Sequence, residues 1–477
     1  MPIIPLKCPS CGAQLQADSD SAILTCKYCG TNSVMKDAIV QNYVQNTVNI
    51  NAATVNVCSQ RDFVIRGGVL EKYCGESVDV VIPNNVTAIG QGAFEGLQIK
   101  SVVIPNSVRE IEDYAFSHCA SLASVTIPNS VTKIGNNAFG WSTALKSITL
   151  PNSIVSIGSS SFFGCSALTS VAIPSGVAKI EYSMFEGCTA LKSVALPDAI
   201  TKISLSAFED CVALKSVVIP NGVKKIDSLA FKGCKSLEEI VIPDSVTEVG
   251  SSAFADCSAL KSVTLPNSIV ELGGSMFSSC TSLTSIALLC NIRYLHSDTF
   301  RCCTSLTSIT IPETVTTIES SAFNNCAALK SVTIPGSVAM IEFGAFQDCR
   351  SLSSVTLGEG VQRIGSCAFK NCSALTSITI PKSVENIAHH AFEGCTALKS
   401  VTFNGAVPYC SSAFEGCTSL DSAKFHNIES KKPDIDDTVK KLLFEARRQE
   451  GKCQHCGGSF KGIFKSVCSS CGWEKDY

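Results

Sequence analysis

The chain has 477 residues, a net charge of −3 and 17% charged residues. So small a net charge gives no whole-chain field that would attract nucleic acid or an anionic membrane. No apolar stretch reaches the roughly 18 residues of a membrane span, and Met1–Ser10 lacks the basic and apolar regions of a secretory signal peptide. We therefore expect neither a membrane span nor export.

Twenty-seven cysteines would suggest disulfides in a small secreted protein. In a large chain without an export signal they favour metal ligands and buried thiols instead. We therefore expect a reducing environment and a cytoplasmic location.

Residues 1–33 contain two C-x2-C pairs separated by 14 residues: Cys8 with Cys11, and Cys26 with Cys29. Two thiolates at this spacing can bind one ion from a tight turn, and four thiolates complete a tetrahedral structural zinc site with no open position for water. The pattern predicts a zinc ribbon. A pair of disulfides and a rubredoxin-like iron site are the alternatives.

Residues 34–77 form a polar lead-in that is rich in Asn and Val between positions 41 and 57. This composition predicts a β-rich segment that ends in an N-terminal cap for the region that follows.

Residues 78–425 repeat about fifteen times with a period of 23 residues. The register is set by a cysteine ladder, which runs without a slip through Cys165, Cys188, Cys211, Cys234, Cys257, Cys280, Cys303, Cys326, Cys349, Cys372 and Cys395. A phenylalanine ladder precedes it by three residues, from Phe116 to Phe392. A fixed period of this length predicts a solenoid in which each repeat packs only on its neighbours. We interpret the ladder thiols as small, inert core side chains.

Within one repeat, residues 124–127 predict a short parallel strand. Val125 and Ile127 point inward, Ser124 and Thr126 point outward, and Pro128 ends the strand because proline cannot donate to the next ladder bond. Residues 136–143 predict a helical turn, with Phe139 buried.

These repeats resemble the BspA-type leucine-rich repeats of bacteria and some protists, over about residues 62–425. The resemblance implies a leucine-rich-repeat solenoid and, for many members, an exported surface protein that binds host or matrix proteins. This chain departs from those members by its missing export signal and by its two cysteine quartets.

Residues 426–451 predict an amphipathic helix or linker, with acidic residues at its start and Arg447 and Arg448 near its end, as the helix dipole favours. We expect this helix to dock on the last repeat or on the following domain. A partner-binding helix is the alternative.

Residues 452–477 contain a second quartet, with Cys453 and Cys456 separated by 11 residues from Cys468 and Cys471. The same reasoning predicts a second zinc ribbon, and hence two structural Zn²⁺ sites in all. Residues 431–477 carry a net charge of only +3 and residues 1–60 a net charge of zero, so neither end has a strong basic patch for nucleic acid.

The outward strand positions predict a small, neutral, hydroxyl-rich face. One column is Ser124, Ser147, Ser170, Ser193, Ser216, Ser262, Ser285, Ser308, Ser331, Ser354, Ser377 and Ser400, and a second column mixes Thr with Ala172, Ala195, Val218 and Val241. Such a face either is simply solvated or binds a protein over a broad area. A repeat without its proline, at residues 288–296, and Trp141 depart from the pattern.

No catalytic motif is present in the sequence, so we expect no enzyme. We expect a non-catalytic, intracellular scaffold that binds one or more protein partners through the repeat array. Two alternatives are a nucleic-acid-associated protein that acts through the ribbons and a surface adhesin.

Overall fold

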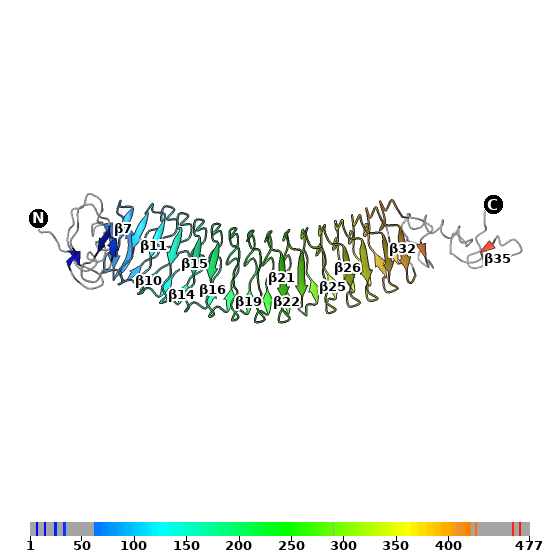
Figure 1. Cartoon of the computed structure of the whole chain (residues 1–477), viewed down its shortest axis with the longest axis horizontal. Coiled ribbons are helices and arrows are strands. Elements are labelled where there is room, and N and C mark those ends of the chain that lie inside the picture. Colours follow the sequence, from blue (N-terminus) through cyan, green and yellow to red (C-terminus); the bar gives the residue numbers. More distant parts are fainter. Residues whose placement is uncertain are drawn as a thin grey trace.

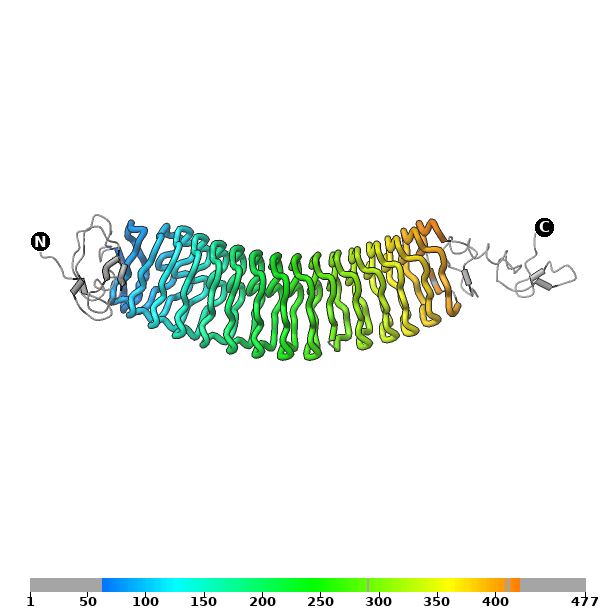
Figure 2. Tube along the Cα trace, in the orientation of Figure 1, coloured from blue at the N-terminus to red at the C-terminus, as the bar shows by residue number. Residues whose placement is uncertain are grey.

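The computed structural model describes residues 62–420, except positions 290, 407 and 411, together with the backbone of seven short outlying strands. Those strands are β1 (Leu6–Lys7), β2 (Gln14–Leu15), β3 (Ile23–Thr25), β4 (Asn32–Val34), β34 (Phe425–His426), β35 (Phe460–Lys461) and β36 (Val467–Cys468). Residues 62–420 wind into stacked coils that form a curved solenoid (Figure 1 and Figure 2). The predicted repeat solenoid of short parallel strands is confirmed.

A first ladder of parallel strands follows the S-V-T motif of each coil. Its members are β7 (Asp79–Val81), β9 (Ser101–Val103), β11 (Ser124–Thr126), β13 (Ser147–Thr149), β15 (Ser170–Ala172), β17 (Ser193–Ala195), β21 (Ser262–Leu265), β23 (Ser285–Leu288), β26 (Ser331–Ile334), β28 (Ser354–Leu357), β30 (Ser377–Ile380) and β32 (Ser400–Phe403), with β34 beyond it. Equivalent residues pair from coil to coil, as Ser124 does with Ser147. Between β17 and β21 the regular pairing lapses, and Val218 and Val241 form an isolated parallel bridge.

A second ladder follows a two-residue step of each coil that usually ends in Ile, and it appears along the lower, convex edge in Figure 1. Its members are β8 (Ala88–Ile89), β10 (Glu110–Ile111), β12 (Lys133–Ile134), β14 (Ser156–Ile157), β16 (Lys179–Ile180), β18 (Lys202–Ile203), β19 (Lys225–Ile226), β20 (Glu248–Val249), β22 (Glu271–Leu272), β24 (Tyr294–Leu295), β25 (Thr317–Ile318), β27 (Met340–Ile341), β29 (Arg363–Ile364), β31 (Asn386–Ile387) and β33 (Tyr409–Cys410). An antiparallel hairpin of β5 (Phe63–Arg66) and β6 (Val69–Tyr73) precedes it, and β6 pairs with β8.

The predicted helical turn is wrong: residues 62–420 contain turns in its place and no α-helix. Asn137 and Trp141 have φ angles of 51° and 59°, which a right-handed helix does not allow. The N–H groups of Asn137, Phe139 and Trp141 donate to carbonyls of the next coil at 2.9, 2.8 and 2.6 Å. The backbone groups of the turns therefore form hydrogen bonds along the solenoid axis, as those of the strands do.

The core is a continuous stack of phenylalanine rings. Fourteen consecutive ring pairs from Phe94 to Phe414 have centroids 4.9–5.8 Å apart and interplanar angles of 2–17°. At the N-terminal end, Tyr73 and Phe63 of the hairpin continue the stack at 5.4 and 5.2 Å. The hairpin therefore covers the exposed face of the first ring.

The cysteine ladder lies beside the ring stack, and its thiols are buried, as predicted. Each thiol donates to the carbonyl of a phenylalanine on the preceding coil, for example Cys165 Sγ to Phe139 O at 3.1 Å. Ser142 occupies one ladder position, and its hydroxyl makes the same bond to Phe116 O at 2.9 Å. The position therefore selects a small side chain that donates one hydrogen bond. Burial raises the pKa of Cys119 and of Cys165 to about 12, so these thiols are poor nucleophiles.

We predict that Phe231→Ala destabilises the array by about 3–5 kcal/mol, because it opens a large cavity in the middle of the ring stack. Urea titration followed by circular dichroism measures the change. Val218→Ala is the matched control, since that side chain is 82% exposed and its loss should cost under about 0.5 kcal/mol. Equal effects of the two substitutions would contradict a core built on the stack.

We also predict steep alkaline unfolding. A ladder thiol whose pKa rises from 9.0 to about 12 on folding stays protonated where the unfolded chain ionises. Stability is therefore complete below pH 9 and falls above it, by about 1.4 kcal/mol per pH unit for each such thiol. Thermal melts between pH 7 and 11 measure the slope. The triple variant Cys188→Ser, Cys211→Ser, Cys234→Ser, which repeats the chemistry of Ser142, should have a smaller slope. An unchanged slope would show that other groups cause the loss.

Candidate interaction surface

The outer face of the first ladder has the predicted alternation. In β11, Val125 is buried while Ser124 and Thr126 are exposed. The same pattern recurs in β13, β15 and β17. The hydroxyl-rich columns therefore face solvent, and the strands contribute only small side chains to this surface over most of its length.

Three large apolar side chains interrupt this face, and we refer to Val218, Val241 and Leu289 as the valine patch. Val218 is 82% exposed, Val241 is 78% exposed and Leu289 is 53% exposed. The two valines are paired by the isolated bridge between their coils. Leu289 occupies the position at which most repeats carry proline, in the irregular repeat that the sequence singled out. The patch lies near the middle of the array.

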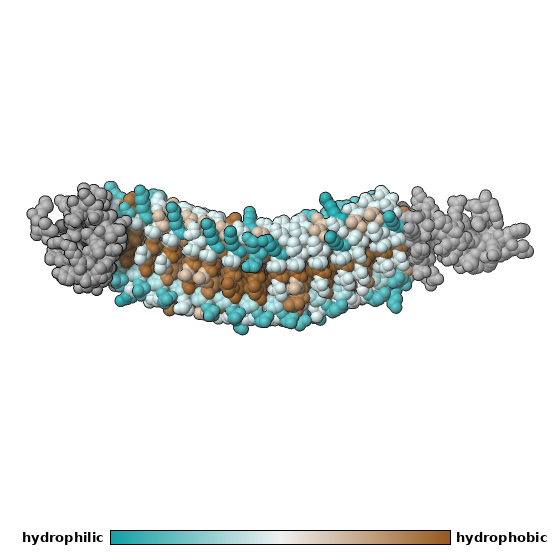
Figure 3. All heavy atoms as spheres, in the orientation of Figure 1, coloured by the Kyte–Doolittle hydropathy of each residue, from teal (hydrophilic) through white to brown (hydrophobic). Residues whose placement is uncertain are grey.

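A shallow hollow of about 350 Å³ connects Val241 with Leu289. It is lined by Glu239, Ile240, Val241, Ile242, Asp244, Ser262, Val263, Thr264, Pro266, Asn267 and Leu289. Two carboxylates, Glu239 and Asp244, stand among otherwise apolar or small neighbours. In Figure 3 an apolar band runs along the face in view, bordered by hydrophilic side chains. The hollow offers apolar contact area with an acidic rim.

The second ladder is rich in charge, and several of its charges pair across coils. Lys133 Nζ lies 2.6 Å from Glu110 Oε1, and Lys225 Nζ lies 2.7 Å from Glu248 Oε2. The hydrogen bond from Lys133 to Glu110 raises the pKa of that lysine. Because these groups are exposed, each pair adds little to stability.

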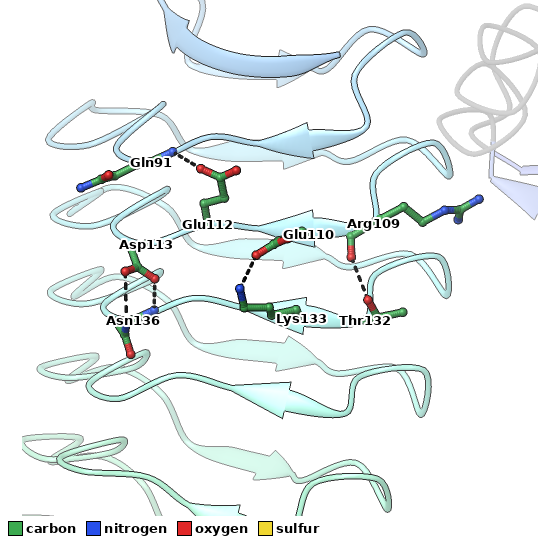
Figure 4. A network of polar contacts seen from close by, with 8 residues as sticks. All are labelled: Gln91, Arg109, Glu110, Glu112, Asp113, Thr132, Lys133 and Asn136. Atoms are coloured by element: carbon green, nitrogen blue, oxygen red, sulfur yellow. Dashed lines mark hydrogen bonds and ion pairs between the residues drawn. The ribbon is translucent and has the colours of Figure 1, made fainter. Parts of the chain in front are cut away.

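Figure 4 shows how such contacts run in parallel along the axis. The backbone N–H and side-chain amide of Asn136 donate to Asp113 at 2.6 and 3.1 Å, and the N–H of Gln91 donates to Glu112 at 3.0 Å. Polar side chains at the corners of the coils thus satisfy backbone groups of the next coil. These contacts act in stacking.

The predicted metal ligands lie outside the described residues: Cys8, Cys11, Cys26, Cys29, Cys453, Cys456, Cys468 and Cys471, of which only the backbone of Cys468 is described, in β36. Within the described part of the chain, no group of three or more His, Cys, Asp or Glu residues is arranged to hold a metal ion. The predicted helix at 426–451 also falls outside it. No helix among the described residues is long and apolar enough to cross a membrane.

In the sequence, Val218 and Val241 are recognisable only as members of the column of outward strand positions that mixes Thr, Ala and Val. The signal that marks them is the adjacency of two β-branched apolar residues in a column that, from Thr126 onward, otherwise carries Thr or Ala. Val81 and Val103 occupy the first two positions of the same column, so the signal is not unique to the patch. The exposure of the two valines could not be predicted from the column alone, because the alternation of inward and outward residues along a strand shows only that these positions point outward. The exposure values identify the patch.

Several proteins are similar to this chain in sequence and in fold. The family model for the BspA type leucine rich repeat region (6 copies) matches residues 71–191, 109–238, 224–352 and 316–435. A leucine-rich repeat protein from Bacteroides ovatus is 30% identical, covers 81% of this chain and 100% of its own, and superposes with a TM-score of 0.60. A leucine rich cell surface protein from Faecalibacterium prausnitzii is 27% identical, covers 80% of this chain and 96% of its own, and has a TM-score of 0.40.

No curated protein matches the chain. The family match spans most of the 477 residues, and the described coils have the same architecture as the Bacteroides ovatus protein over its whole length. The chain belongs to the BspA type leucine-rich repeat family.

Proposed function

We propose that this protein is a non-catalytic, intracellular scaffold that binds a protein partner through its repeat array, with the valine patch as the main contact. The observation that carries the proposal is the exposure of Val218 and Val241, at 82% and 78% of their surface. Burying a valine side chain in an interface contributes about 1.5–3 kcal/mol. Exposed valines contribute no free energy to a face that stays in contact with water, whereas they contribute binding free energy to a face that a partner covers.

The chemistry of the described residues favours binding over catalysis. The ladder thiols are buried with raised pKa values, which suppresses the thiolate that nucleophilic catalysis needs. Several lysines and carboxylates of the second ladder pair across coils, as Lys133 does with Glu110 and Lys225 with Glu248. The patch, by contrast, presents apolar surface with a rim of Glu239 and Asp244. A protein surface with apolar and basic groups is the complementary partner.

The two cysteine quartets are proposed as closed, structural zinc sites. Strands β1 and β2 pair antiparallel, and so do β3 and β4, so that each C-x2-C pair of the first quartet falls in the connection of a hairpin. Strand β36, which includes Cys468, pairs with β35. This arrangement fits a ribbon, in which hairpins present thiolates to one ion. Zinc would then stabilise the domains at both ends.

The proposed intracellular location is supported by the protonated ladder thiols. Each one donates its S–H to a phenylalanine carbonyl, as Cys211 does to Phe185 O at 3.1 Å. A disulfide would remove that donor. The described residues also contain many unpaired cysteines, a pattern common in reducing compartments and rare in secreted proteins.

We predict that Val218→Asp with Val241→Asp lowers capture of a protein partner from source-cell lysate at least about tenfold, because two carboxylates replace the apolar contact. Quantitative pull-down with the full chain measures it. The matched control is Thr126→Asp with Thr149→Asp, which adds the same charge to the same column away from the patch. The proposal fails if both double variants lose the partner equally or if neither does. Nuclease treatment of the lysate tests whether nucleic acid mediates capture.

We predict about two zinc ions per purified chain, falling to about one in Cys8→Ser with Cys11→Ser, because half of a four-thiolate site cannot retain the ion. Atomic absorption measures the content. Cys211→Ser in the buried ladder is the control and should leave it unchanged. Iron in place of zinc, or a zinc content that stays the same when Cys8 and Cys11 are replaced, would contradict the assignment.

A further inference from the structure

A row of lysines runs along one edge of the first ladder, directly before its strands. Lys146 precedes β13 and Lys192 precedes β17, and the same column contains Lys100 and Lys215. Backbone hydrogen bonds stack this column from coil to coil. The N–H of Thr169 donates to Lys146 O at 3.2 Å, and the N–H of Lys192 donates to Thr169 O at 2.9 Å. We call Lys100, Lys146, Lys192 and Lys215 the lysine row.

The charges of the lysine row are exposed, and Lys146 and Lys192 form no ion pair within residues 62–420. The columns on both sides of these coils are neutral: Ser124, Ser147, Ser170, Ser193 and Ser216 on one side, and Ser121, Ala144, Ala167, Ala190 and Ala213 on the other. The first carboxylate that the column reaches is Glu238, and Lys261 of the next coil pairs with it at 2.7 Å. That hydrogen bond, and less strongly the charge of Lys215, lowers the pKa of Glu238. The row therefore presents positive charge that stacking does not use.

The opposite edge of the same strands carries the opposite charge. Strand β17 has Lys192 before it and Asp198 after it, and Asp244 occupies the position of Asp198 two coils further on. Both aspartates are exposed. Strand β17 is 3 residues long, which corresponds to about 10 Å. The face of the first ladder is therefore positive along one edge and negative at these points of the other, with small side chains between.

We propose that the lysine row binds an extended acidic segment of the protein partner. From Lys100 to Lys215 the column makes five hydrogen-bonded steps from coil to coil. At about 4.8 Å a step they cover about 24 Å, which an extended chain of about eight residues spans. A nucleic-acid duplex, whose grooves are about 12 and 6 Å wide, would also cover the acidic edge. A single strand would find no aromatic ring for its bases in the neighbouring Ser and Ala columns.

This inference rests on the proposed scaffold function and adds the chemistry and the orientation of the partner. Val218 follows Lys215 by three residues on the same coil, so a partner on the valine patch also reaches the end of the lysine row. Its acidic segment would lie along the row, and its basic groups would face the edge that includes Asp198 and Asp244. A partner turned by half a circle would bring like charges together at both edges, so the charges select one orientation.

The test uses the full chain with fluorescein-labelled octa-glutamate, octa-serine and an oligothymidylate of the same length, in fluorescence polarisation at low salt. We expect octa-glutamate to bind, the oligothymidylate to bind at least about threefold more weakly, and octa-serine not to bind. Lys146→Gln with Lys192→Gln should weaken octa-glutamate binding by about three- to tenfold. The matched control is Lys179→Gln with Lys224→Gln, which removes the same charge from exposed positions beyond the row and should change binding less than about twofold.

Three results would overturn the inference. Equal losses in the two double lysine variants would reduce the effect to net charge. Unchanged octa-glutamate binding in Lys146→Gln with Lys192→Gln would exclude the row. Equal or tighter binding of the oligothymidylate that depends on the same two lysines would assign the row to nucleic acid. Octa-glutamate binding is measured on the purified chain, so any of these results leaves the scaffold function standing if Val218→Asp with Val241→Asp still loses the lysate partner and its threonine control does not.

Discussion

The bond that the whole structure depends on is the one between each coil and the next. Strand residues donate to strand residues one repeat away, and the turn side does the same through groups such as the N–H of Phe139 to Ser161 O at 2.8 Å. The ring stack and the thiol ladder add side-chain contacts in the same direction. No coil has a hydrophobic core of its own, so its stability comes from its two neighbours.

This constraint explains which features of the chain could be predicted from its residues. Phe139 and Cys165 recur every 23 residues because each must meet its own copy on the next coil, and a strict period makes that requirement visible in the sequence. The strand at 124–126 was equally readable, since alternation of small polar and apolar residues specifies one buried face. The solenoid fold and its core residues could therefore be predicted from the period of the sequence alone.

Other features depend on geometry that residue identity does not carry. The segment at 136–143 was expected to form a helical turn, but Asn137 and Trp141 adopt positive φ angles, and its Asn, Gly, Ser and Thr residues are weak helix formers. Likewise, the outward direction of Val218 was predictable, while the extent of its exposure, 82%, was seen only in the structure. The ring contacts of Trp141 with His118 and Phe163 join three coils, and the linear sequence does not show that these side chains meet.

The nearest-neighbour stacking also sets a gradient of fraying along the array. A terminal coil loses only one interface when it opens, whereas a central coil must break two, so opening begins at the ends and moves inward. The β5–β6 hairpin slows the opening of the first coil at the N-terminal end, because its Tyr73 covers the ring of Phe94. The valine patch lies on central coils, where local opening is rarest. A partner that binds there meets a surface already held in its bound shape, and association needs no ordering of the receptor.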